Sequence, residues 1–407
     1  MNSVAVPATV TVIGYDGSPL SPIARTSLAE ATLVVGGARH LDGVGPPGGA
    51  SLLVLGNLDH ALDGIAAHVR RARGPICVVA SGDPGFFGIV RILRERGFGV
   101  RTHPVASSVS SAFAAVGLAW DDAVVVSAHG REPRAAVNVC RAFPKVAVLT
   151  GPGSGAREIG TALLGTGRTL VVAQRLGESD ERVETVTPET AAERDDWLDP
   201  HVVISLDERR RLCERGWLAG WNGVAGPWGL PESGFEHRDS MITKSEVRAL
   251  ALSRLAPRPG TLIWDVGAGS GSVGVECARF GAAVVAIERD AQSCERITAN
   301  AAALGVYVDV VEGQAPEALA GLPEPDAVFV GGGGLDAVGA AAGSPARTVV
   351  VALAAIERAP ETIQILTMSG REVDGLLVQT SRLAALPGGA HRFAATNPVF
   401  LLWGERR

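Results

Sequence analysis

The chain has 407 residues, of which 46% are hydrophobic and 20% are charged, so it is long enough for two or three domains and too apolar to be mainly disordered. Its formal net charge of −6 argues against a nucleic-acid-binding scaffold, which needs a basic surface. Five scattered cysteines without a C-x-x-C pair argue against a disulfide framework or a zinc site, and no apolar run has the length of a transmembrane helix, so we expect a cytoplasmic protein. Glycine is enriched, with 51 residues mostly in short clusters, which suggests loops where main chain approaches a ligand.

The first half consists of short apolar runs separated by helical stretches. The runs do not alternate with polar residues, and each ends at Gly, Ser or Thr, which is typical of strands buried on both faces of a mainly parallel α/β sheet. Helices are expected between them, for example at residues 61–73 and 87–96. The strands are expected at residues 10–14, 32–37, 51–56, 76–82, 124–127 and 145–150.

The pattern changes near residue 206. Residues 207–215 are charged and predict a helix, with the basic run 209–211 on a solvated face. Residues 216–234 are rich in Gly and Pro and predict a linker that carries Trp217, Trp221 and Trp228. These tryptophans either pack onto one or both domains or form an inter-domain clamp.

A second α/β pattern follows the linker. Strands alternate with helices through the first five strands, and the last two strand-like runs predict an antiparallel closure of the sheet. The expected helices are 244–255, 272–280 and 291–304, and the expected strands are 261–266, 283–287, 307–312, 327–331, 348–353, 375–382 and 398–403.

One strand of the second half runs into a glycine loop and then into a helix. Gly267 and Gly269 fit a nucleotide-binding turn, but Ser272 stands where a dinucleotide fingerprint has its third glycine. Asp265 would repel a pyrophosphate, whereas it suits the cationic methionine end of S-adenosylmethionine. The next expected strand ends at Glu288, and an acid at that place accepts hydrogen bonds from ribose hydroxyls.

Two further loops follow the third and fourth strands of the second half. Gln314 follows the third strand, where an adenine-contacting side chain is expected, and residues 331–334 are four glycines after the fourth strand. Together these features predict an S-adenosylmethionine site. A nicotinamide oxidoreductase and a nucleic-acid methyltransferase are the alternatives, against which Asp265, Ser272 and the negative net charge argue.

Both halves resemble known families. Residues 235–248 (FEHRDSMITKSEVR), 265–273, 312–319 and 328–334 resemble the precorrin methyltransferase domain that methylates C15 of a tetrapyrrole and removes a carboxylate. Residues 80–88 (ASGDPGFFG) resemble the tetrapyrrole methylase family, as do the flanking segments 12–14, 20–22, 34–41, 104–109 and 127–131. In this order the halves resemble the fused C5,15-methyltransferases of cobalamin biosynthesis.

The resemblance implies the fold and the domains. It implies a two-lobed tetrapyrrole methylase fold over residues 1–206, a linker over 207–233 and a class I Rossmann-like methyltransferase fold over 234–407. The implied reactions are methylation of precorrin-6B at C5 by the first domain, and C15 methylation with loss of the ring C (C12) acetate by the second, giving precorrin-8. The implied cofactor is S-adenosylmethionine, at one site in each domain and without a metal.

Other readings of the resemblance stay open. The cobalt-precorrin version of the same steps is one alternative, and another S-adenosylmethionine-dependent small-molecule methyltransferase is the other. The implied partner is the tetrapyrrole, without nucleic acid or membrane, and relatives of the second half imply a homo-oligomer. The nucleophile would be an electron-rich carbon of the macrocycle, so the enzyme mainly orients the reactants and excludes water.

Candidate site residues combine the motifs with the resemblance. The substrate carries many carboxylates, so cations near the sites, among them Arg39, Arg131 and Arg248, are candidate partners. His129 is preferred over His237 for proton transfer. The candidate catalytic residues are His129, Arg238 and Lys244. The candidate cofactor-binding residues are Gly82, Asp83, Pro84, Phe86, Ser107, Ser108, Asp265, Gly267, Gly269, Gly271, Glu288, Gln314, Ala315 and Gly331.

Three segments depart from the family patterns. Residues 14–19 lack the usual G-x-G-P-G form of the first loop, and Gln314 stands where methyltransferases often carry Asp. Residues 351–357 lack the Asn or Thr that relatives often show there, so no substrate role is carried over to that loop.

Overall fold

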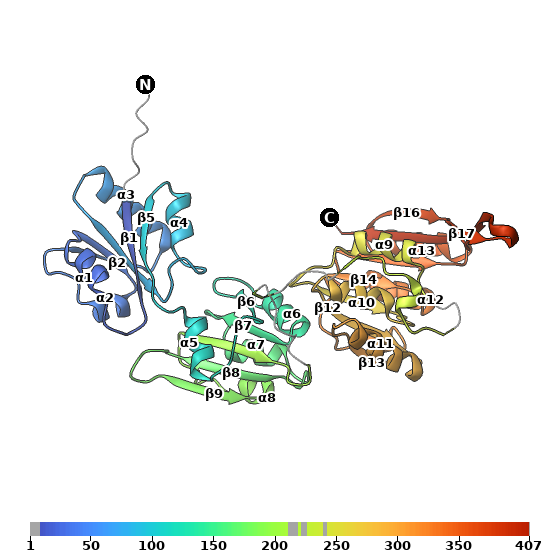
Figure 1. The fold of residues 1–407 in the computed structure, drawn as a ribbon, viewed down its shortest axis with the longest axis horizontal. Coiled ribbons are helices and arrows are strands. Elements are labelled where there is room, and N and C mark those ends of the chain that lie inside the picture. Colours follow the sequence, from blue (N-terminus) through green and yellow to red (C-terminus); the bar gives the residue numbers. More distant parts are fainter. Residues whose placement is uncertain (1–8, 211–218, 221–225, 239–241, 407) are drawn as a thin grey trace, which may run out of the picture. The chain divides into compact units, whose positions relative to one another are not determined.

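The computed structural model describes residues 9–210, 219–220, 226–238 and 242–406. The chain forms two compact units (Figure 1), one of Met1–Asp121, Val125–Arg131 and Ala147–Leu206, the other of Asp122–Val124, Glu132–Val146 and Asp207–Arg407. Among the described residues, no helix combines the length and apolarity needed to cross a membrane. Trp217 and Trp221, on which the clamp hypothesis depends, lie outside the described residues.

The first sheet is fully parallel and lies near the N-terminus. Its strand order is β3-β2-β4-β1-β5. One face packs on helices α3 and α4, and the other packs on α1 and α2, so the inner strands β1, β2 and β4 are buried on both sides and need no polar alternation, whereas the edge strands β3 and β5 are more exposed. The elements are β1 (Thr9–Tyr15), α1 (Pro22–Ala29), β2 (Leu33–Gly36), α2 (Ala38–Val44), β3 (Ser51–Val54), α3 (Leu58–Arg70), β4 (Ile76–Ser81), α4 (Val90–Glu95) and β5 (Gly99–His103).

The second sheet has the strand order β6-β7-β10-β8-β9, and β8 pairs with both β10 and β9 in the antiparallel direction. The prediction of a mainly parallel sheet is confirmed for the first sheet, and the antiparallel strands β8, β9 and β10 of the second sheet are not among the strands that the sequence predicted. Its elements are α5 (Ser108–Ala115), β6 (Val124–Ser127), α6 (Arg134–Ala142), β7 (Lys145–Leu149), α7 (Ala156–Ala162), β8 (Thr169–Gln174), β9 (Arg182–Val186), α8 (Pro188–Glu193) and β10 (His201–Leu206).

The third sheet belongs to the C-terminal half and has the order β13-β12-β11-β14-β15-β19-β16. Strands β11 to β15 are parallel, and β19 pairs antiparallel with β15 and β16, as the predicted closure required. The elements are α9 (Ser245–Leu255), β11 (Leu262–Val266), α10 (Ser272–Arg279), β12 (Ala283–Glu288), α11 (Ala291–Ala303), β13 (Asp309–Glu312), β14 (Ala327–Val330), α12 (Gly334–Gly343), β15 (Thr348–Leu353), α13 (Arg358–Met368), β16 (Glu372–Val378) and β19 (Val399–Glu405).

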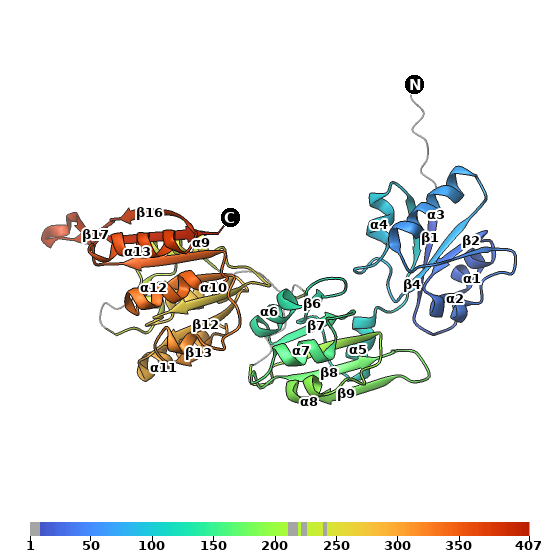
Figure 2. The same cartoon turned by 180° about the vertical axis from the view of Figure 1, so that it is seen from behind.

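Helices cover both faces of this sheet (Figure 2). Helices α9, α10 and α11 contribute to one apolar cluster, and α12 and α13 to the other. Successive strand residues alternate between the clusters: Ile263 belongs to the first, and Leu262 and Trp264 belong to the second. The α/β fold class expected for both halves is confirmed.

Two expected elements of the chain need correction. Residues 375–382 do not form one strand, because β16 ends at Val378 and a separate hairpin of β17 (Ser381–Ala385) and β18 (His391–Ala395) follows. Residues 208–210 form a turn, not the start of a helix. Arg209 is exposed as expected, whereas Arg210 is mostly buried, and both guanidinium groups bond to the buried carboxylate of Asp207; Arg211 lies outside the described residues.

Candidate functional site

The carboxyl ends of β11 and β14 meet at the point of the third sheet where the strand order reverses. Gly267 has φ +67, and a Cβ there would lie 2.6 Å from the Cα of Gly332. The Gly331 amide donates to the Val266 carbonyl at 2.9 Å. Two glycine loops are thus packed backbone against backbone at the place where open α/β sheets bind ligands.

Asp265 lies beneath these loops and is 1% exposed. Its Oδ2 accepts from the Gly274 amide at 2.7 Å, whereas its Oδ1 has no partner. Burial, with a smaller contribution from Glu288, raises the pKa of this carboxyl to about 7. A buried acid with an unused oxygen fits a cationic group bound nearby.

The Glu288 carboxylate connects the loop that follows β11 with the loop that follows β12. Its Oε2 accepts from the Gly269 amide at 2.9 Å, and its Oε1 accepts from the Arg289 and Asp290 amides at 2.9 and 3.0 Å. The side chain is half-buried at the end of β12, as the sequence motif predicts for a ribose-binding acid.

The remaining predicted cofactor residues of this domain differ in their surroundings. The Gly313 amide donates to the Glu288 carbonyl at 2.9 Å, which places exposed Gln314 and buried Ala315 beside the same edge. Gly271 has φ +70, and a Cβ there would lie 2.8 Å from Ile297, so packing against α11 already requires glycine at this position.

The family-specific segment before α9 is attached to the glycine loop by Asn300, which the sequence analysis did not single out. The Asn300 side chain accepts from the Glu236 amide at 2.7 Å and donates to the carbonyls of Glu236 and Ser270, both at 2.9 Å. This brings Arg238, which is exposed, close to the cofactor edge. The hydrogen bond from the Ser293 side chain lowers the pKa of Asp290, and the charge of Arg238 adds a smaller shift in the same direction.

Arg248 is not a substrate-binding cation, contrary to the expectation. Its side chain is fully buried and bonds to Glu276 at 2.6 Å, while Glu276 accepts from the Gly229 and Leu230 amides at 2.7 and 2.9 Å. Arg248 also donates to the carbonyls of Thr243 and Leu230. Burial and complete pairing leave it a structural role, whereas Lys244, the N-cap residue of α9, is half-buried.

Arg382 of the β17–β18 hairpin was also missed. Its guanidinium donates to Glu232 at 2.8 and 2.9 Å and to Glu246 at 2.7 and 3.0 Å. These two acids flank the segment that carries Arg238 and Lys244, so Arg382 holds both ends of that segment.

The first compact unit has its own glycine-lined edge, at the carboxyl ends of β1 and β4. A Cβ on Gly14 would lie 2.1 Å from the Gly82 carbonyl oxygen. Gly82 has φ +58, and a Cβ there would lie 3.2 Å from Ser107 Cα and from Ser108 N. The structure therefore brings Gly82, Ser107 and Ser108 together, as the resemblance implies, and adds Gly14.

The turn after Gly82 is stabilised by a hydrogen bond to the side chain of Asp83 within the turn. Asp83 Oδ1 accepts from the Gly85 amide at 2.8 Å, Pro84 is buried, and Phe86 is 36% exposed against Phe87. The Asp83 side chain thus shapes the turn.

A polar cluster adjoins this edge at the ends of β2 and β4. Ser81 Oγ lies 3.0 Å from His40 Nε2 and accepts from Arg39 at 3.1 Å. Arg39, a candidate carboxylate partner of the substrate, also forms an ion pair with Glu178 at 2.6 Å and is partly exposed. His40 and Ser81 were not predicted; the short spacing of Arg39 and His40 after a strand was the available signal.

His129 follows β6 on the second sheet. Its Nδ1 bonds to the Thr150 carbonyl at 3.1 Å, and because a carbonyl only accepts, Nδ1 carries the proton. The exposed ring therefore keeps Nε2 as a proton acceptor. Arg131, two residues later, is exposed.

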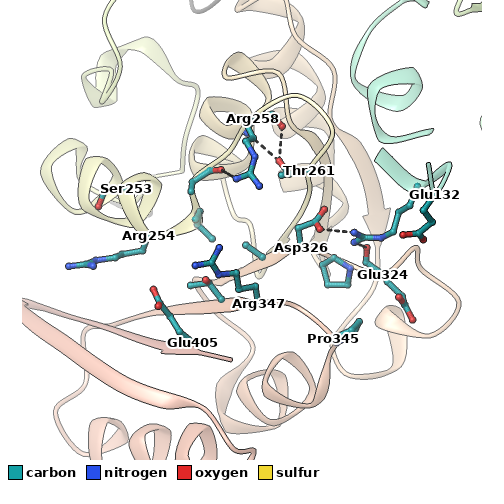
Figure 3. Close-up of a pocket in the computed structure, with 16 residues that line it drawn as sticks. Glu132, Ser253, Arg254, Arg258, Thr261, Glu324, Asp326, Pro345, Arg347 and Glu405 are labelled. Atoms are coloured by element: carbon teal, nitrogen blue, oxygen red, sulfur yellow. Dashed lines mark hydrogen bonds and ion pairs between the residues drawn. The ribbon is translucent and has the colours of Figure 1, made fainter. Parts of the chain in front are cut away.

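A separate hollow of about 530 Å³ lies at the opposite, amino-terminal ends of β11, β14 and β15 (Figure 3). Asp326 lines this hollow. One of its carboxylate oxygens accepts from the Leu262 amide at 2.7 Å, and the other accepts from Arg134 at 2.6 Å. None of the described buried polar atoms without a partner lines it. The hollow is distant from the glycine loops, and we assign it no part in the reaction.

Known proteins match both halves of the chain. The family model described as the precorrin methyltransferase domain matches residues 233–405, and the model of tetrapyrrole (corrin/porphyrin) methylases matches residues 6–192. A crystal structure of the C-terminal domain of precorrin-6Y C5,15-methyltransferase from Rhodobacter capsulatus is 35% identical with a TM-score of 0.38, covering 44% of this chain and 97% of that chain.

Two curated relatives match different lengths of the chain. A probable cobalt-precorrin-6B C(15)-methyltransferase (decarboxylating) of Pyrobaculum calidifontis is 35% identical over 184 residues, which are 43% of this chain and 94% of that protein. The precorrin-6Y C(5,15)-methyltransferase (decarboxylating) of Sinorhizobium sp is 39% identical over 341 residues, which are 80% of this chain and 78% of that protein. The chain therefore belongs to the family of precorrin-6Y C5,15-methyltransferases (decarboxylating).

Proposed function

We propose that this chain holds two S-adenosylmethionine sites, one at the Gly14–Gly82 edge and one at the Gly267–Gly331 edge, and that it methylates precorrin-6B at C5 and C15. The domains would be residues 1–206 and 234–407, joined by 207–233. The observation that carries the proposal is the presence of two separate glycine-packed strand edges in one chain. Bound S-adenosylmethionine supplies an electrophilic methyl group.

The residues of the second edge fit this cofactor. The unpartnered Oδ1 of Asp265 would receive a cationic group at the methionine end, and Glu288 would accept from the ribose hydroxyls. Gly267 and Gly331 would let main chain lie against the nucleoside, with Gln314 and Ala315 at the adenine. These roles require no change in the described backbone bonds.

The residues of the first edge would bind through shape and main chain. Gly82, Ser107 and Ser108 form the wall of the edge, and Asp83, Pro84 and Phe86 shape the adjoining turn. Here the chain offers backbone groups and hydroxyls in place of a buried acid.

For the substrate, Arg238 and Lys244 would bind carboxylates of the tetrapyrrole beside the second edge. The macrocycle can accept the electrons released when the ring C acetate loses carbon dioxide, so the protein needs to orient the reactants and exclude water. We assign this decarboxylation, with C15 methylation, to the second domain. His129 would assist proton transfer in the first.

Product masses test the division of labour in the full-length chain. The unmodified protein with precorrin-6B and S-adenosylmethionine should add two methyl groups and release carbon dioxide. Glu288→Ala should suppress one methylation together with carbon dioxide release, and Gly14→Ala should suppress only the other methylation. Carbon dioxide release that persists in Glu288→Ala but stops in Gly14→Ala would contradict the assignment.

The same assay separates the second candidate, the cobalt-containing substrate, which the similarity to a cobalt-precorrin enzyme over the C-terminal half favours. Turnover of cobalt-precorrin-6B in preference to the metal-free compound would support it. A homo-oligomer is also proposed, and its mass in solution would test it.

A further inference from the structure

We propose that Ser81 and His40 form a proton relay of the first site, which removes the proton that the substrate carbon gives up after methylation. This inference rests on the proposed C-methylation by the first domain. The relay begins at Ser81, which is exposed and directly precedes Gly82 of the candidate cofactor edge. It continues to His40 in the first turn of α2, the helix that follows β2, and β2 is a direct neighbour of β4 in the sheet.

Hydrogen-bond chemistry gives the direction of the relay. Arg39 can only donate, so Ser81 Oγ accepts from it at 3.1 Å. Among the described residues, His40 Nε2 at 3.0 Å is the acceptor within reach of the Ser81 hydroxyl. The relay requires the hydroxyl hydrogen to point to Nε2 and the ring proton to lie on Nδ1, and this tautomer is itself a testable part of the proposal.

The surroundings keep His40 neutral. Burial and the neighbouring Arg39 charge lower its pKa to about 4, against a smaller opposing effect of Glu178. The Tyr15 ring also faces it edge-on, with centroids 6.2 Å apart. A neutral imidazole whose unprotonated Nε2 already accepts a hydrogen bond from Ser81 is the form that can take up a proton.

The Arg39–Glu178 ion pair places the cluster where two parts of the same compact unit meet. Arg39 follows β2 of the first sheet, and Glu178 lies in the loop between β8 and β9 of the second. A large planar substrate at the Gly82 edge would therefore lie beside Ser81.

The chemistry of C-methylation needs such an acceptor. When the meso carbon forms its new bond to the methyl group, the sulfur keeps the electron pair of the broken bond and the macrocycle gains a positive charge. That carbon still carries its hydrogen. Its C–H electrons return to the macrocycle, the proton passes to Ser81 Oγ, and the original Ser81 proton passes to His40 Nε2. The cationic macrocycle is a strong acid, so a weak base suffices.

Three variants test the relay in the full-length protein. His40→Gln keeps a polar group but cannot hold the extra proton, and Ser81→Ala removes the link. His68→Gln is the matched control, because His68 forms a similar pair with Thr32 at 3.0 Å at the opposite end of the same sheet, and burial also lowers its pKa. We expect His40→Gln and Ser81→Ala to lower the kcat of the methylation carried out by the first domain about 100-fold. His68→Gln should leave that kcat unchanged.

Nitrogen NMR of the imidazole rings gives a readout that does not depend on turnover. His40 should show the proton on Nδ1 and a titration midpoint near 4, moving in Ser81→Ala. His68 should show the proton on Nε2, because Thr32 donates to the Pro75 carbonyl and accepts from the ring.

The outcomes separate the relay from the proposed function. S-adenosylhomocysteine binding at the first site in each variant reports whether the first unit is folded. If the unmodified protein performs no first methylation, the proposed function fails. If it does, and His40→Gln retains the full rate or His40 carries its proton on Nε2, the relay alone is overturned.

Discussion

The two candidate cofactor edges of this chain are built by different means. At the Gly14–Gly82 edge, main chain packs so closely that a single Cβ on Gly14 would lie 2.1 Å from a carbonyl oxygen. At the Gly267–Gly331 edge, close packing recurs, but two acids, Asp265 and Glu288, also organise the loops. The comparison teaches that the second edge depends on ionisable side chains and the first on shape.

The largest expected effect concerns the buried pair that supports the second edge. Arg248→Ala leaves Glu276 charged in a site where both side chains are fully buried, so we expect a loss of about 3–5 kcal/mol in the free energy of unfolding of the second unit. Urea unfolding followed by fluorescence measures it. Arg96→Ala breaks an exposed pair of the same 2.6 Å length in the first unit and should cost about 1 kcal/mol or less. Equal losses would show that burial does not matter here.

The next effect is on cofactor affinity. Glu288→Ala removes an acid that bonds to three backbone amides, and we expect a loss of about 1.5–3 kcal/mol in S-adenosylhomocysteine binding at the second site. The control is Glu312→Ala, at the matching position of neighbouring β13. Calorimetry measures both. A similar loss at the first site would erase the distinction between the edges.

A smaller effect is the pH dependence that Asp265 gives to stability and to cofactor affinity at the second site. The pKa of Asp265 is raised to about 7 in the folded chain, so folding binds a proton, and this contribution to stability is complete below the ordinary pKa and is lost as the pH rises toward 7. A cationic ligand favours the ionised form, so affinity should weaken about tenfold per unit as the pH falls below 7.

Calorimetric titration at several pH values checks this trend. Asp265→Asn should bind more weakly and lose the dependence, and the first site should show no such slope. A pH-independent affinity of the unmodified second site would contradict the role of Asp265.

The smallest effect concerns Arg382, which holds both ends of the segment that carries Arg238 and Lys244. Arg382→Ala frees Glu232 and Glu246, and because these groups are partly exposed the expected change is about 1 kcal/mol, seen as a several-fold higher KM for the tetrapyrrole in the second reaction. Steady-state kinetics with Arg392→Ala, on the adjoining strand, as control would test it. An unchanged KM would assign Arg382 to the hairpin alone.

The sequence predicted strands from continuous apolar runs, both where the run is buried on both faces, as in β2 and β4, and where it is exposed, as in β3. Strands β8 and β10 carry the same pattern, so their signal was present although they were not predicted. Strands β5 and β17 were missed for a different reason, since their side chains alternate or lie exposed at an edge. The β17–β18 hairpin interrupts a run that reads as one strand.

The candidate site divides in the same way. Glycine loops and strand-end acids follow from local patterns, because the turn and the strand end fix their position. Asn300, Arg248 and Arg382 act through partners that are 30, 28 and about 140 residues away, and no local pattern reports such pairs. The sequence alone does not distinguish a buried, structural arginine such as Arg248 from an arginine that binds substrate.

The stoichiometry of S-adenosylhomocysteine binding to the full-length chain tests the central claim most directly. Calorimetry should find two sites per chain, one in Glu288→Ala, one in Gly14→Ala and none in the double variant at the same ligand concentrations. A single site in the unmodified chain, or the loss of both sites in either single variant, would contradict the account of two independent cofactor edges.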